Sequence, residues 1–125
     1  MRPELTEGLV ARHPALLSMP KGTVIAQRGI ECGDGWHDLI DDTLTAIEKH
    51  CATVDAMPPA ILQIKQKIGL LRIYFRPYDE GIEAILHAAE KRSASICEQC
   101  GRPGKLVIGQ YIHVTCGHDH DDERR

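Results

Sequence analysis

The chain has 125 residues, and its 15 Lys and Arg against 18 Asp and Glu give a formal net charge of -3 at pH 7. This length accommodates one domain with a modest hydrophobic core. Hydrophobic residues make up 42% of the chain, but its apolar runs are too short for a helix that spans a bilayer. The negative net charge argues against a protein that binds nucleic acid through overall positive charge.

Residues 1–28 form an N-terminal segment that we expect to be irregular, because prolines and a glycine interrupt it. LVARHPALL, residues 9–17, predicts a short helix that ends before Pro14, and TVIAQ, residues 23–27, predicts a short strand. The acids and prolines near Met1 are unlike the apolar stretch of a signal peptide, so we expect a cytoplasmic protein.

A glycine-flanked turn and a long helix follow. The sequence GDGW, residues 33–36, predicts the turn, and Asp34 is placed to cap a helix over residues 36–54. Apolar residues recur there at three- and four-residue spacing, which predicts one buried stripe. The stripe consists of Trp36, Leu39, Ile40, Leu44, Ile47 and Cys51. The opposite side is acidic, and we call Asp38, Asp41, Asp42 and Glu48 the acidic face.

Residues 61–76 predict a β-hairpin centred on Gly69. Apolar and polar residues alternate on both sides of that glycine, which is the period of a half-buried strand. In this alternation Leu62, Ile64, Gln66 and Ile68 share one side of the first strand. A helix over residues 60–68 is the alternative. The segment carries four basic residues and no acid: Lys65, Lys67, Arg72 and Arg76.

A second amphipathic helix is predicted over residues 78–95, with Asp79 as its cap. It completes a helix–hairpin–helix body over residues 29–95. The fold we expect is therefore α+β, with two amphipathic helices packed on a small antiparallel sheet.

Residues 96–120 contain a predicted zinc module. Cys97 and Cys100 are three positions apart, and Gly101 permits the tight turn that lets both thiolates reach one ion. We call this turn, residues 97–101, the knuckle. Residues 104–115 predict a hairpin that brings Cys116 back to it. His120 supplies the fourth ligand of a structural Cys3His zinc site, with one ion per chain.

His118 is the alternative fourth ligand. We favour His120 because the longer spacing lets its imidazole fold back onto the ion without straining the turn, while His113 is expected to face solvent or the sheet. Cys32 and Cys51 are expected to be core residues, and a second metal site that they form with His50 is an alternative.

No catalytic residue is predicted, because four protein ligands fill the zinc shell and leave no position for a reacting water. Similar knuckles brace HNH-type nuclease motifs, but those need a further helix carrying His or Asn. Only nine residues follow Cys116, and the last five, residues 121–125, are a charged tail.

Several motifs occur together in this chain: GIECGDGWHDLID, QIKQKIGLLRIYF, AEKRS, and CEQCG-x-PG followed by a cysteine and a histidine. Over residues 29–120 the chain resembles a group of small, largely uncharacterised proteins encoded by phages and prophages of proteobacteria. The resemblance implies an origin in a phage or mobile element, and it supplies no activity.

The expected function is non-enzymatic binding to a host protein in the bacterial cytoplasm, through the acidic face. Clustered carboxylates suit a target that normally grips nucleic acid, so inhibition of a bacterial defence system, in the manner of an anti-CRISPR protein, is the sharpest hypothesis. The alternative is a nucleic-acid-binding regulator of phage DNA metabolism or transcription that uses the basic hairpin and the zinc knuckle.

Overall fold

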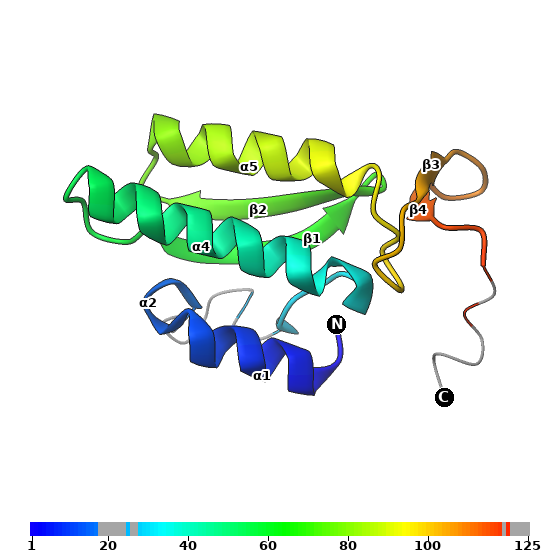
Figure 1. Ribbon diagram of the computed structural model, residues 1–125, viewed down its shortest axis with the longest axis horizontal. Helices are drawn as coiled ribbons and strands as arrows, with labels where there is room; N and C mark the ends of the chain where they lie inside the picture. Colours follow the sequence, from blue (N-terminus) through cyan, green and yellow to red (C-terminus); the bar gives the residue numbers. More distant parts are fainter. Residues whose placement is uncertain (18–24, 26–27, 119, 121–125) are drawn as a thin grey trace.

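The computed structural model describes residues 1–17, 25, 28–118 and 120. The fold is α+β, as the sequence predicts, with helices packed against antiparallel hairpins (Figure 1). In chain order the elements are α1 (Pro3–Arg12), α2 (Pro14–Leu17), the 3-10 turn η1 (Asp34–Trp36), α4 (His37–Thr53), β1 (Ala60–Lys67), β2 (Leu70–Arg76), α5 (Glu80–Ser93), β3 (Lys105–Val107) and β4 (His113–Thr115).

Helices α4 and α5 lie side by side against the β1–β2 hairpin, and α1 and α2 pack below α4 in the view of Figure 1. The small β3–β4 hairpin stands at one end, next to the turn that joins β1 to β2. One buried cluster joins these elements. Its largest fully buried side chains include Trp36, Ile40, Leu44, Ile47, Ile61, Ile64 and Leu71.

The β1–β2 hairpin confirms the predicted turn at Gly69, and the alternative helix over residues 60–68 is wrong. Ile68 and Gly69 form a two-residue turn with φ of 52° and 82°, and two consecutive positive φ values are typical of the type I′ turn that suits twisted strands. The predicted alternation fails at two points, because Ile68 lies exposed in the turn and Leu62 leaves the buried side. A register shift between Ile61 and Gln63 brings both Ile61 and Ile64 into the core, so Leu62 is only partly buried.

The two long helices match their predicted patterns. Every residue of the predicted α4 stripe is buried. Asp79 caps α5 as predicted, because its carboxylate accepts a hydrogen bond of 2.9 Å from the amide of Ile82. Asp34 is not the cap of α4. Its carboxylate binds the backbone amide and the guanidinium of Arg2, both at 2.8 Å, because the start of α1 lies against η1.

The N-terminal segment is more helical than the sequence indicates. α1 ends at Arg12 and α2 begins at Pro14, so the helix breaks before that proline as expected. Of the strand predicted over residues 23–27, only Ile25 lies among the described residues; it is buried and helical, so the prediction of a strand is wrong at this position.

Candidate metal centre

Three cysteines and one histidine from two separate loops converge beyond the C-terminal end of α5. Cys97 and Cys100 belong to the loop that follows α5, and Cys116 and His120 follow β4. One ligand atom from each residue lies within 4.8 Å of all the others, and this is the one such group found in the part of the chain that the structure describes.

The distances in this cluster match the edges of a tetrahedron around a metal ion. Metal–sulfur bonds of about 2.3 Å and a metal–nitrogen bond of about 2.0 Å give S···S and S···N edges of about 3.8 and about 3.5 Å. In the structure Cys100 Sγ lies 3.6 Å from Cys116 Sγ. His120 Nε2 lies 3.5 Å from Cys97 Sγ and 3.4 Å from Cys116 Sγ. All cysteines are free, so the residues fit one divalent ion such as zinc.

The backbone of the knuckle turns tightly around the first thiol. Gly101, at φ of 82°, donates its amide to the carbonyl of Cys97 at 2.9 Å, and Cys97 donates its own amide to the carbonyl of Arg102 at 2.8 Å. Glu98 then donates to the carbonyl of Val114 on β4 at 3.2 Å. The first two bonds shape the turn itself, and the bond from Glu98 to Val114 joins this turn to the second hairpin.

The GDGW segment before α4 is the platform for this knuckle. The amide of Gly35 donates to the carbonyl of Glu98 at 2.7 Å, and the indole of Trp36 donates to the carbonyl of Ile96 at 2.9 Å. A methyl group on Gly35 would overlap the carbonyl oxygen of Cys97, and one on Gly33 would overlap that of Glu98. The two glycines are therefore needed for close approach of two chain segments, which the sequence indicated only as a turn.

Even without a metal ion, the surroundings of the cluster favour the thiolate form of one cysteine. Burial opposes ionisation of Cys97, but backbone amides of Cys100, Gln99 and Cys116 point at its sulfur and lower its pKa to about 6. Burial, together with neighbouring thiols, raises the pKa of Cys100 to about 11. Ionisation of Cys100 near neutral pH therefore needs an adjacent positive charge, which a divalent cation supplies.

The other histidines and cysteines lie apart from the cluster. His118 is exposed, and its backbone amide, rather than its ring, contacts Cys116 Sγ, at 3.4 Å. His113 is half-buried, with its ring 4.8 Å from that of Tyr111. Cys32 is buried in the core, and burial raises its pKa to about 12. His50 binds Asp79 at 3.1 Å, so the alternative second metal site does not form.

The acidic face is partly committed to contacts within the chain. His13, between α1 and α2, is buried, with its ring nitrogens 2.6 Å from Asp41 Oδ1 and 2.7 Å from Glu48 Oε1. Asp42 lies 3.7 Å from the guanidinium of Arg92, and Asp38 is almost fully exposed beside His37. Two of the four predicted partner-binding carboxylates thus hold the N-terminal helices on α4.

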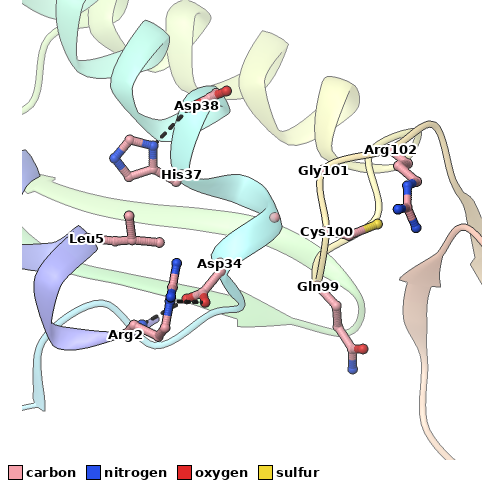
Figure 2. Close-up of a pocket in the computed structure, with 10 residues that line it drawn as sticks. Arg2, Leu5, Asp34, His37, Asp38, Gln99, Cys100, Gly101 and Arg102 are labelled. Atoms are coloured by element: carbon pink, nitrogen blue, oxygen red, sulfur yellow. Dashed lines mark hydrogen bonds and ion pairs between the residues drawn. The ribbon is translucent and has the colours of Figure 1, made fainter. Parts of the chain in front are cut away.

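A polar hollow of about 490 Å³ lies beside the knuckle, between the start of α1 and the start of α4 (Figure 2). Arg2 and Asp34 line it as an ion pair, and His37 lines it hydrogen-bonded to Asp38 at 2.9 Å. Cys100 and Gly101 form its opposite wall. Because these charged groups are paired with each other, we interpret the hollow as the boundary at which α1 meets the knuckle.

No family model, curated protein or solved structure matches this chain. Among the described residues, no helix has the length and apolar character needed to cross a membrane.

Proposed function

We propose that this protein is a non-enzymatic, protein-binding module whose Cys3His cluster holds one structural zinc ion. Three thiolates and one imidazole in tetrahedral array are the ligand set typical of structural zinc, and they leave no position for a substrate or a reacting water. The role of the ion is then to hold the β3–β4 hairpin in place against the body.

The observation that supports a binding role is a set of exposed apolar side chains on the two hairpins. Ile68 in the β1–β2 turn is 65% exposed, and Ile108 and Tyr111 between β3 and β4 are 77% and 69% exposed. We call Ile68, Leu106, Ile108 and Tyr111 the apolar tip. Large apolar side chains that stay exposed on neighbouring elements are typical of surfaces that bind proteins.

The turn of the first hairpin touches the side of the second hairpin. A methyl group on Gly69 would lie 2.7 Å from Leu106 Cδ1 and 2.8 Å from Ile112 Cγ2, so the β1–β2 turn packs directly on the second hairpin. The metal cluster fixes the base of that hairpin through Cys116. Zinc therefore orders the apolar tip without contacting the partner.

Exposed Lys67 and Lys105 flank the apolar tip, so we expect a partner with an apolar groove bordered by carboxylates. The resemblance to phage proteins makes a host protein the proposed partner. The most specific form of this proposal is that the partner is a component of a bacterial defence system. Because Asp41 and Glu48 hold His13, the apolar tip takes the place of the acidic face as the proposed contact surface.

A site-specific photo-crosslinker tests this proposal. We expect a crosslinking residue at Ile108 to give one discrete product with a host protein, and the same residue at Met57 to give none. Met57 is a matched control because it is also apolar and exposed, but it lies in the loop between α4 and β1. Ile108→Ser should abolish retention of that host protein, whereas Met57→Ser should not. Equal products at both positions, or equal retention by both variants, would refute the proposal.

A further inference from the structure

The register of the β1–β2 hairpin gathers its basic residues on one face. Lys65 pairs directly with Arg72, and Lys67 and Arg76 follow at two- and four-residue spacing on their strands, so all four share a face with Tyr74. Ile64 and Leu71 point to the opposite face, where they are buried in the core. We call Lys65, Lys67, Arg72, Tyr74 and Arg76 the basic face.

The charges of the basic face are compensated only in part. Glu31, which pairs with Lys65 across an isolated parallel bridge, lies on the same face, but its carboxylate accepts a hydrogen bond from Gln63 at 2.9 Å and lies 3.9 Å from Arg28. Arg72 lies 3.4 Å from Glu90, and this is the one ion pair that any of the four cations makes with a described residue. Lys67, Arg72 and Arg76 are exposed, and pairs between such side chains are weak. A chain of net charge -3 therefore carries a local concentration of positive charge on one sheet face.

An aromatic pocket opens beside the basic face, between β2 and α5. Its volume is about 320 Å³, and Arg72, Tyr74, Phe75 and Tyr78 contribute to its lining. The ring of Tyr78 stacks on that of Phe75, with centroids 6.4 Å apart and planes inclined by 25°. Tyr78 is 73% exposed, so aromatic surface is available directly next to the cations.

We propose that the basic face and the aromatic pocket together bind single-stranded nucleic acid. Proteins bind single strands by tracking the phosphates with cations and stacking the bases on aromatic rings, which are the two features that adjoin here. Along β2 the side chains of Arg72, Tyr74 and Arg76 repeat at about 6.8 Å, so cation, ring and cation follow one another along an extended strand.

The acidic residues of the pocket determine how the bound nucleic acid strand is oriented. Glu83 and Glu90 line its α5 side together with His87, and carboxylates repel phosphates. The phosphates therefore lie over the basic face, and one base turns into the pocket against Tyr78. A base held inside a duplex cannot enter the pocket, so single strands bind more tightly than duplexes of the same length. The basic face adjoins the apolar tip at Lys67, but no residue of the apolar tip lines the aromatic pocket, and binding of the strand does not depend on a protein partner.

Fluorescence anisotropy with a labelled oligothymidine of about 15 nucleotides tests the proposal at several salt concentrations. Four phosphate contacts predict that log K falls with log[salt] at a slope of about -2.8. The triple variant Lys65→Gln, Lys67→Gln, Arg76→Gln should bind more weakly and shift the slope toward zero by about 2. Tyr78→Ala should weaken binding several-fold at an unchanged slope, because it removes a stacking contact and no charge.

The matched control is Lys49→Gln, Lys91→Gln, Lys105→Gln, which removes three exposed cations that lie outside the basic face. It should bind like the native chain, and circular dichroism should show all variants folded. The proposal is overturned if the native chain does not bind the oligonucleotide at low salt, or if a duplex binds at least as tightly. It is also overturned if the control variant weakens binding as much as the basic-face variant, or if Tyr78→Ala leaves affinity unchanged.

Discussion

Replacing Gly35 with alanine places a methyl group where the knuckle touches the start of α4. The added carbon would overlap the carbonyl oxygen of Cys97, and it would lie 2.5 Å from the amide nitrogen of Gly101 and 2.7 Å from that of Cys100. All three neighbours are backbone atoms of the ligand-bearing turn, so no side chain can rotate to make room. The knuckle must move away from α4.

The cost of this movement follows from the contacts that it breaks. Forcing an extra methyl into a packed site costs about 1–3 kcal/mol. Separating the knuckle from α4 also breaks the 2.7 Å hydrogen bond from Gly35 to Glu98, worth about 1 kcal/mol. We therefore expect Gly35→Ala to lower the free energy of unfolding by about 3 kcal/mol and the melting temperature by about 10 °C.

Thermal unfolding followed by circular dichroism measures this loss, and transfer of metal to a chromogenic chelator measures the opening of the knuckle. Gly8→Ala is the matched control, because a methyl group at that position of α1 meets nothing within 4 Å. Alanine is the better helix former by about 0.5–1 kcal/mol, so the control should melt slightly higher than the native chain. A Gly35→Ala variant that melts at the native temperature and releases metal at the native rate would refute the inference that the knuckle packs directly on Gly35.

Two further predictions concern the metal ligands and the buried histidine. Cys97→Ser, or removal of metal by a chelator, should lower the melting temperature of the whole chain, because the knuckle is bonded to α4 through Trp36; an unchanged temperature would show that the module is an independent appendage. Hydrogen bonding to His13 lowers the pKa of Asp41, so its contribution to stability is present above the ordinary value of 3.8 and is lost as pH falls through the lowered value. Asp41→Asn should therefore flatten the fall in melting temperature on acidification, and parallel curves for variant and native chain would contradict this role.

Features that depend on neighbouring residues in the sequence were predictable. The stripe of α4 and the cap at Asp79 follow from helical spacing and local hydrogen bonding, and the turn at Gly69 follows from the alternation around it. The metal cluster was predictable for the same reason. Two cysteines in one turn are followed by a hairpin, which returns the chain to its starting point, and Cys116 lies beside the first two cysteines as this spacing predicts.

Features that depend on distant segments were not predictable. The contact of Gly35 with the knuckle joins segments about 60 residues apart, and no local pattern distinguishes a glycine needed for close approach from one needed for a turn. Asp41 and Glu48 are bound within the chain by His13, and His13 reaches them only because α1 and α2 fold back onto α4. The bulge after Ile61 likewise reflects what the core requires rather than the alternation of the strand.

The central claim is that Cys97, Cys100, Cys116 and His120 hold one zinc ion. Native mass spectrometry of protein purified without added metal, combined with X-ray absorption at the zinc edge, tests it most directly. We predict one zinc per chain, with three sulfur neighbours at about 2.3 Å and one nitrogen neighbour at about 2.0 Å. A stably folded chain that carries no metal, or zinc with a shell of oxygen and nitrogen, would contradict the claim.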